Sequence, residues 1–575
     1  MQVGEQSSVE KASTNRSTWW LLWAALVSLS WLVPVHAFPW TAFHAEMVAA
    51  IGAAPLFVWA VVADRGSVRI PREAAAVCLL AMVPLVQRTV GMIQLPGDAW
   101  LAVLYLLSFA AAIVVGARAQ ILRPWVMPEA LFSSFAIAAT FSVGLALTQW
   151  LQLGQLGGFV FALANTSRPA ANVGQPNHLA TLLVWGLLAL WWAYLRGHVR
   201  GAICTVAAAL LLFGVAMTQS RTGALEVLVL GFAAVAFRRQ LCSRRSAWAL
   251  LSLCVGFVLA FSTWSNLNEW LQLSPVNTLE QRMVPGTRWA HWQLLVDAIV
   301  QRPWAGWGWN QVVLAQVALA SQFGATHEVI QYSHNVVLDL LVWNGIPLGL
   351  LACGLVLWWL IAQVRLAQSA ERVLVLLAVA VFLLHAQLEF PHAYAMFLLP
   401  VGLMIGALHV PASRMTEPEV PRMWVALPFA ALLVCLTLVI RDYFRIEQAW
   451  TAQRLRAARI GSTAVTPLPD VAILGNLKAM LEFMRTEPRR EMSASEIDQL
   501  RKVAHRQPSA GGLFRYAEAL ALNGRVDEAK ANLDLLCRLH PVPQCTTAKA
   551  AWMAVAAQGK PEMRQAWPGD WPQDQ

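Results

Sequence analysis

Apolar segments of membrane-spanning length recur from residue 18 to residue 441. A helix needs roughly 20 mostly apolar residues to cross about 30 Å of hydrocarbon. A short polar segment, residues 1–17, precedes the first apolar segment. The pattern predicts an all-α membrane domain with about thirteen transmembrane helices, at residues 18–37, 47–63, 74–95, 99–117, 129–151, 178–195, 202–218, 224–237, 247–264, 340–364, 373–388, 395–411 and 424–441.

The composition supports this interpretation. Of the 575 residues, 58% are hydrophobic and 13% are charged, whereas an average soluble domain is about 25% charged. So little charge excludes an ordinary cytosolic enzyme, a disordered chain and a secreted disulfide scaffold. The net charge of +10 is also typical of nucleic-acid binding, but basic residues in a membrane protein first report its topology.

The distribution of arginine predicts the orientation. If the N-terminus is cytoplasmic, most basic residues before the tail fall in inner loops, and the short outer loops hold only Arg168 and Arg221. Positive charge marks the cytoplasmic side. An odd number of helices then places the long loop 265–334 and the tail 442–575 outside the cytoplasm. The positive charge is therefore a membrane anchor, and no nucleic-acid partner is expected.

The tail has no further membrane helix. Within it, residues 508–541 predict a helical hairpin with a turn at Asn523–Gly524 and a stop at Pro541. This hairpin is either a tetratricopeptide-like repeat or part of a generic helical domain. A single repeat cannot bury its apolar face alone, so the rest of the tail or a partner must cover it. Cys537 and Cys545 are the only cysteines in the tail, and in an oxidising compartment they are a candidate disulfide.

Two short motifs lie at predicted outer helix ends. Gln175-Pro176-Asn177-His178 opens a predicted helix. It is either a helix start capped by Asn177 or a set of amide and imidazole donors aimed into an outer cavity. Ser220-Arg221-Thr222-Gly223 forms a tight turn between two helices. Its arginine either extends to the membrane surface or binds phosphate through the planar guanidinium.

The long outer loop carries two further candidate sites. Arg288 begins an amphipathic stretch. Further on, Trp and Gly alternate over residues 304–309, a pattern that predicts either an aromatic platform for a sugar or isoprenoid or a turn at the membrane interface. Tyr332-Ser333-His334-Asn335 opens the next helix. A helix start favours a neutral imidazole, the form that a general base needs, although a histidine there can equally be a helix cap.

His385, Glu389 and His392 lie close together in sequence near one outer helix end. Pro391 interrupts the helix, and the spacing matches no established zinc motif, so no metal is expected. The chain also has no phosphate-binding glycine loop and no dinucleotide motif, which argues against nucleotide chemistry.

The order of these motifs resembles that of the bacterial PglL-type protein O-oligosaccharyltransferases, which are relatives of the O-antigen ligases and Wzy-type polymerases. The matching motifs are Gln175–His178, Ser220–Gly223, Arg288 with Trp292, Ser333–Asn335 and Glu389–Pro391. The Gln-Pro-Asn-His motif favours the protein-glycosylating branch.

The resemblance implies transfer of a glycan from undecaprenyl pyrophosphate to Ser or Thr of pilin or another exported protein. The reaction takes place on the periplasmic face of the inner membrane and needs no cofactor. The family likeness implies that His334 is the base and that Arg221 and Arg288 hold the pyrophosphate. The residues implied to orient sugar or acceptor are Gln175, Asn177, His178 and Glu389.

Two alternatives remain open. The same chemistry serves an O-antigen ligase, which uses a lipid A core acceptor, or a polymerase, which extends a glycan. Alternatively, the chain is a transporter or membrane scaffold without enzymatic activity. A transporter typically shows paired internal repeats or broken helices, and no internal repeat is visible in this sequence.

Overall fold

The computed structural model describes residues 19–64, 66–153, 157–163, 168–242, 244–273, 288–410, 417–461, 467–557 and 561–565. The described chain is nearly all helix, which confirms the predicted α class. Two short strands, β1 (Val68–Arg69) and β2 (Glu419–Val420), pair antiparallel with Val68 opposite Val420. The chain divides into two compact units, each described by itself below.

Every predicted membrane segment falls on a helix in the structure. These helices are Trp19–Trp31, α2 (Phe43–Val62), α3 (Arg72–Thr89), α4 (Pro96–Leu122), α5 (Val126–Trp150), α6 (Pro176–Leu195), α7 (Gly201–Thr218), α8 (Arg221–Ala236), α10 (Arg244–Ser262), α15 (Val336–Leu366), α16 (Ala370–Ala386), α17 (Ala395–Leu408) and α18 (Arg422–Ala457). Helix α9 (Arg238–Leu241) follows α8, and α11 (Trp264–Trp270) follows α10.

The described part of the chain has the helices of a multi-pass membrane protein. Seven of its helices are long and apolar enough to cross a membrane, or eight if α10 and α11, bent by 60°, form one span. The remaining segments coincide with helices that are shorter or less apolar. The prediction of about thirteen spans therefore stays a prediction.

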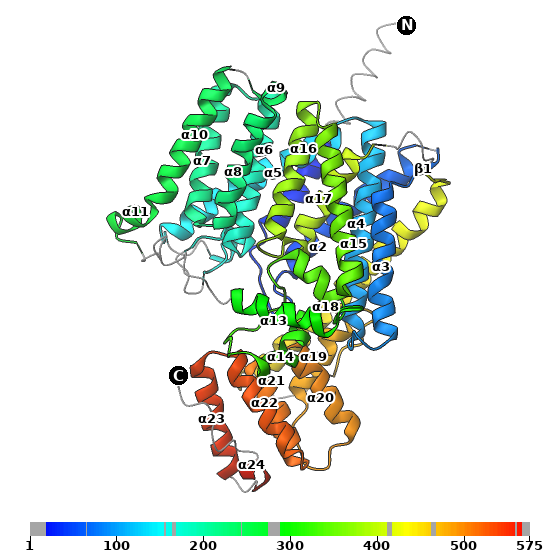
Figure 1. The fold of residues 1–575 in the computed structure, drawn as a ribbon, viewed down its shortest axis with the longest axis vertical. Helices are drawn as coiled ribbons and strands as arrows, with labels where there is room; N and C mark the ends of the chain where they lie inside the picture. The colour runs from blue at the N-terminus through cyan, green and yellow to red at the C-terminus, as the bar shows by residue number, and fades with distance from the viewer. Residues whose placement is uncertain are drawn as a thin grey trace. The chain divides into compact units, whose positions relative to one another are not determined.

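Helix α6 is the central helix of the first unit, which comprises residues 1–80, 105–284 and 357–436. It packs against α5, α7, α8 and α16, and 72% of its most apolar window is buried (Figure 1). A helix that is apolar on all sides is typically enclosed by other helices. Since α6 begins at Pro176, this position brings the Gln175–His178 motif next to the ends of its neighbours.

The second unit comprises residues 81–104, 285–356 and 437–575. Besides parts of α3, α4, α15 and α18, it contains α13 (Arg288–Gln301), α14 (Val312–Leu319), a 3₁₀ turn at Ala320–Gln322, and the tail helices α19 (Gly475–Arg485), α20 (Ala494–Arg506), α21 (Ala510–Leu522), α22 (Val526–Leu539), α23 (Val542–Ala557) and α24 (Pro561–Gln565).

The predicted tail hairpin is present as α21 and α22. Its turn contains Gly524 at φ +76°, a left-handed conformation that glycine adopts without a Cβ penalty. The apolar face of the hairpin is covered from within the unit: Leu513, Leu533 and Trp552 are fully buried in a core shared with α20, α23 and α24. The requirement that a lone hairpin be covered is thus met by the neighbouring helices.

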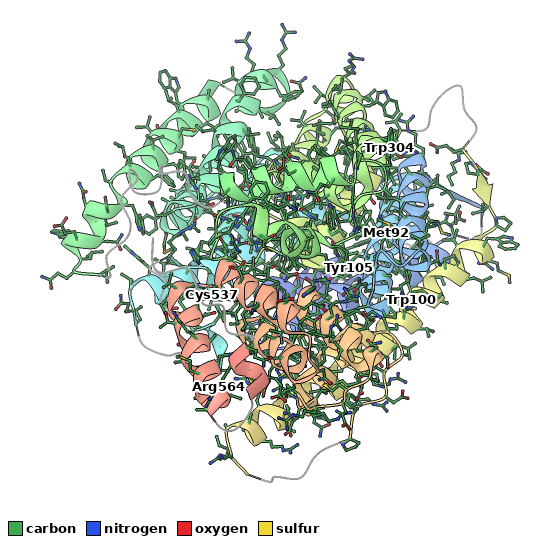
Figure 2. All side chains as sticks on the ribbon, turned by 60° about the horizontal axis from the view of Figure 1, so that its bottom comes forward. Met92, Trp100, Tyr105, Trp304, Cys537 and Arg564 are labelled. Atoms are coloured by element: carbon green, nitrogen blue, oxygen red, sulfur yellow. A yellow bond between two sulfur atoms is a disulfide. The ribbon has the colours of Figure 1, made fainter. Side chains whose placement is uncertain are left out.

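A disulfide joins Cys537 of α22 to Cys545 of α23, with the two Cα atoms 4.8 Å apart. Cys537 is buried among the tail helices (Figure 2). The crosslink therefore fastens α23 to the hairpin.

Candidate functional site

Three helix ends of the first unit bring four polar side chains together. Gln175 is the N-cap residue of α6, Asn177 lies in its first turn, Ser220 is the N-cap residue of α8, and Glu389 follows the end of α16. These four residues are called the helix-end cluster below. The local sequence explains the helix starts: Pro176 occupies the first position of α6, and the Ser220 hydroxyl accepts a hydrogen bond from Gly223 N at 3.0 Å.

A buried carboxylate joins the cluster. Glu389 is 1% exposed, and its two oxygens accept hydrogen bonds from Asn177 Nδ2 at 2.7 Å and from Gln175 Nε2 at 3.2 Å. Ser220 Oγ donates to Asn177 Oδ1 at 2.7 Å. Two amides thus bind one carboxylate, and the hydroxyl holds one of the amides in its orientation.

The alternative interpretation of Asn177 as a helix cap is wrong. Its side chain bonds to Glu389 and Ser220, and Gln175, not Asn177, occupies the N-cap position. His178 is separate from the two amides. Its ring is 1% exposed and lies among aromatic rings, with centroids 4.8 Å from Tyr394 and 5.1 Å from His385.

Arg221 is the first residue of α8, and its side chain is exposed. Gly223 allows the first turn of α8 to pack closely against α6. A side chain at this position would clash, because its Cβ would be 2.6 Å from Ala180 Cβ. Arg168, which the sequence suggested only as a loop charge, also belongs to this region. Its guanidinium donates to Thr218 O at 2.9 Å and to Asn177 Oδ1 at 3.3 Å.

Deeper in the same three helices lies a second group of polar side chains. Thr181 of α6 is one turn beyond Asn177, His385 of α16 is one turn before Glu389, and Glu226 lies in the second turn of α8. Thr181 Oγ1 lies 2.6 Å from Glu226 Oε1 and 2.7 Å from His385 Nδ1. All three side chains are fully buried, and they are called the buried trio below.

Sequence reasoning missed Glu226 and Thr181. The available signal was an acidic residue inside an otherwise apolar segment, which is uncommon in membrane helices and usually functional. Among the described residues, no group of three His, Cys, Asp or Glu side chains is arranged to hold a metal ion.

The second unit contains His334 and Arg288. Helix α15 is capped by Asn335, whose Oδ1 accepts hydrogen bonds from Val337 N at 3.0 Å and Leu338 N at 3.1 Å. The alternative interpretation of His334 as the cap is therefore wrong. His334 itself is half-buried, with a left-handed backbone at φ +57°. Such a conformation is uncommon for a residue with a side chain and is often found at functional sites.

Helix α13 holds the segment around His334 in place. Trp292 Nε1 donates to Ser333 O at 2.9 Å. Arg288 is the first residue of α13, four positions before Trp292, so the two share one helix face. Burial lowers the pKa of the neighbouring His291, and His334 lowers it further, whereas Glu328 raises it. The motifs around Arg288 and His334 thus form one local structure.

The Trp–Gly segment has a structural function that its composition did not reveal. Helix α15 is broken at Gly345, and the loop backbone bonds there: Trp307 N donates to Val342 O at 2.7 Å and Gly308 N to Trp343 O at 3.1 Å. Gln87 reinforces this contact, donating to Trp343 O and accepting from Trp309 N, each at 2.8 Å.

The tryptophans of this segment do not form an open aromatic platform. Trp307 and Trp309 are each 7% exposed, and the Arg302 guanidinium covers the Trp307 ring at 4.0 Å. Trp304, by contrast, is 81% exposed (Figure 2). A cavity of about 540 Å³ lies beside Arg302 and Trp307, and its other walls include Arg501, His505 and Tyr516 of the tail helices.

Comparison with protein families identifies three regions. Residues 169–193 match the family described as protein glycosylation ligase, residues 206–353 match O-antigen ligase, and residues 373–554 match the C-terminal region of virulence factor membrane-bound polymerases. These regions include Gln175–His178, Ser220–Gly223, Ser333–Asn335 and Glu389.

Two curated relatives from Acinetobacter baylyi extend over most of the chain. One, named general O-oligosaccharyltransferase, is 29% identical over 534 residues, which cover 90% of this chain and 92% of the relative. The other, named ComP-specific O-oligosaccharyltransferase, is 23% identical over 487 residues, which cover 82% of this chain and 85% of the relative. Together these matches confirm the resemblance of the chain to the protein O-oligosaccharyltransferases within the O-antigen ligase superfamily.

Proposed function

We propose that the protein transfers a glycan from undecaprenyl pyrophosphate to a Ser or Thr hydroxyl of pilin or another exported protein. The observation that carries this proposal is the match to the two oligosaccharyltransferases, which extends through both the membrane helices and the tail. The predicted motifs occur in the family's order within that span.

The proposed topology follows from the arginine distribution. Residues 1–17 are cytoplasmic, residues 18–441 form the transmembrane glycosyltransferase domain, and the loop 265–334 is periplasmic. Residues 442–575 form a periplasmic helical domain with a tetratricopeptide-like hairpin at 508–541. The enzyme then lies in the bacterial inner membrane. The disulfide between Cys537 and Cys545 supports an oxidising location for the tail.

The reaction requires a base, because the acceptor hydroxyl has a high pKa. Its oxygen attacks the anomeric carbon, the bond from that carbon to the pyrophosphate oxygen breaks, and the hydroxyl proton passes to the base. We assign this function to His334. Asn335 caps the helix, so the imidazole is not needed for that purpose, and Trp292 holds the preceding residue in place.

The leaving pyrophosphate requires fixed positive charge. Arg221 and Arg288 each stand at the first position of a helix, α8 and α13 respectively. Backbone N–H groups at a helix N-terminus already favour anions, and a guanidinium adds a planar fork of donors. We assign pyrophosphate binding to both residues. We assign the orientation of the sugar or the acceptor to Gln175, Asn177, His178 and Glu389.

The runner-up function is that of an O-antigen ligase or polymerase, which the matches over 206–353 and 373–554 favour. Purified protein in liposomes containing undecaprenyl-pyrophosphate glycan, offered pilin and lipid A core together, distinguishes the candidates. We expect glycosylated pilin. Exclusive labelling of lipid A core would establish the ligase, elongation of the lipid-linked glycan would establish a polymerase, and no transfer to any acceptor would contradict all three.

A further inference from the structure

The buried trio has no function in the reaction as proposed above, although it contains two ionisable side chains. Thr181, Glu226 and His385 are each 0% exposed. Within the described part of the chain, Glu226 Oε2 and His385 Nε2 have no hydrogen-bond partner. Burying an isolated charge costs free energy, so ionisable side chains are rare inside membrane helices and usually functional. The buried carboxyl and imidazole therefore indicate a function other than packing.

The hydroxyl of Thr181 connects the two ionisable groups. It lies 2.6 Å from the Glu226 carboxyl and 2.7 Å from His385 Nδ1, and both distances are those of strong hydrogen bonds. A threonine hydroxyl has one hydrogen, so it passes a proton on only when it donates to one of these neighbours and accepts from the other. Its longer contact to Asn177 O, at 3.4 Å, competes weakly for that hydrogen. Two arrangements of protons are related by such a transfer.

In the first arrangement, protonated Glu226 donates to Thr181, which donates to the unprotonated Nδ1 of neutral His385. In the second, the imidazolium of His385 donates to Thr181, which donates to the Glu226 carboxylate. The conversion breaks the O–H bonds of Glu226 and Thr181 and forms a new O–H bond on Thr181 and an N–H bond on His385. No proton is gained or lost. Burial favours the neutral arrangement at rest.

The charge created on His385 acts on Glu389, since the two side chains interact electrostatically. Glu389 lies one turn further along the chain, and its backbone N donates to His385 O at 2.8 Å. The other titratable groups around His385 are Glu226, His178 and His392. An imidazolium here stabilises the Glu389 carboxylate, the form that accepts hydrogen bonds from both Gln175 and Asn177.

We propose that Thr181, Glu226 and His385 form a buried proton-transfer site that sets the charge environment of Glu389. The three are positioning residues, which act on the reaction through Glu389. When an anionic donor binds near the cluster, it changes the electrostatic potential at Glu389 and His385. Transfer of the Glu226 proton through Thr181 to His385 then places a positive charge on His385, and no proton is taken from solvent. The effect on catalysis rests on the proposed glycan transfer, whereas the proton-transfer site itself does not.

Matched variants at Thr181 test the proposal. Thr181→Val keeps the shape but removes the hydroxyl, and Thr181→Ser keeps the hydroxyl. We expect Thr181→Val to lower glycan transfer roughly 10- to 100-fold, as follows when a buried polar group loses its hydrogen-bond partner. It should also shift the acidic limb of the pH–rate profile to higher pH, because His385 no longer receives the proton of Glu226 and no longer stabilises the Glu389 carboxylate, and Thr181→Ser should restore both. A wild-type pH–rate profile in Thr181→Val would overturn the proposal.

Infrared spectroscopy of the purified full chain supplies a measurement independent of activity. We expect a carboxylic-acid C=O band that disappears in Glu226→Gln and shifts in Thr181→Val. The control is Glu46→Gln, since Glu46 is also buried but accepts from Tyr105 and the Ala395 backbone instead. Removing it should leave the Glu226 band unchanged. Absence of a Glu226 acid band in the wild type would refute the site. If that band is present but wild-type protein transfers no glycan, the proposed function fails and the proton site stands.

Discussion

The membrane helices and the tail handle polar side chains in opposite ways. In the helix-end cluster, Glu389 is 1% exposed and its carboxyl bonds to two amides from another helix. In the tail, charges form short-range pairs at the surface, such as Arg525 with Glu528, whose side chains are 39% and 53% exposed. Exposed pairs contribute about 0–1 kcal/mol, whereas a buried polar group left without its partner costs roughly 1–3 kcal/mol.

This contrast indicates where functional polar side chains lie. Where water is absent, a polar group generally needs a specific partner, and three helix ends of the first unit hold one group of side chains that meet this need by bonding to one another. In the tail, water stabilises exposed charged side chains, so a charged residue there does not by itself indicate a functional site.

His334→Asn should lower the transfer rate by about 10²–10⁴-fold, because asparagine cannot serve as the base. Asn335 already caps α15, so the substitution leaves the helix start intact. Donor lipid should still bind, since the arginines remain. Transfer rate and donor binding are measured on the same purified variant. Wild-type turnover would disprove the general base, and loss of donor binding would instead make His334 a pyrophosphate ligand.

Glu389→Gln should lower transfer roughly 10- to 100-fold, corresponding to the cost of a buried donor that loses its acceptor. The new amide presents hydrogens to Asn177 or Gln175, where a carboxylate oxygen accepted them. The matched control in the tail is Glu528→Gln, which should leave transfer nearly unchanged. Size-exclusion profiles establish that both variants fold. Equal effects at the two positions would remove the contrast between buried and exposed carboxylates.

Arg221→Lys and Arg288→Lys should each lower transfer about tenfold or more, because lysine keeps the charge but loses the planar fork of donors. Arg302→Lys is the control: Arg302 covers the Trp307 ring, and its replacement should have a smaller effect. The measurement is the transfer rate as a function of donor concentration. Full activity of both Arg221→Ala and Arg288→Ala would contradict their assignment to pyrophosphate binding.

The smallest effect on transfer near neutral pH is expected from titration of the tail. Burial, with a contribution from Arg501, lowers the pKa of His505 from 6.5 to about 4. Between these values the unfolded tail binds more protons than the folded tail. The contribution of His505 to tail stability is therefore fully present above pH 6.5, decreases as the pH falls toward 4, and levels off below it. The loss is at most about 3 kcal/mol.

Hydrogen exchange in α20, α21 and α22, corrected for the intrinsic pH dependence of exchange, measures this loss. The control is His505→Gln, which has no titrating imidazole at this position and should show a weaker dependence between pH 6.5 and 4. Identical pH dependence in the wild type and His505→Gln would show that His505 does not destabilise the tail in acid.

The helices and the tail hairpin were predictable because their signals are local. A run of apolar residues predicts a helix whatever packs against it. The turn at Asn523–Gly524 and the stop at Pro541 are likewise signals within the hairpin sequence, and they mark where its helices end. The chemical motifs were visible for a similar reason: Ser220 caps α8 through Gly223, three residues away. These features depend on contacts within a few residues of sequence.

The tertiary structure alone decided which polar groups meet. Asn177 and Glu389 are 212 residues apart in sequence, and Thr181 and His385 are 204 apart, so no local pattern shows that they share hydrogen bonds. For the same reason, the sequence left the Trp–Gly segment open between an aromatic platform and an interfacial turn, and only the fold shows its backbone bonded to the break in α15. The helices, the family resemblance and the candidate residue types can be read from the amino-acid sequence alone. Their partners and burial depend on helix packing, which joins side chains distant along the chain.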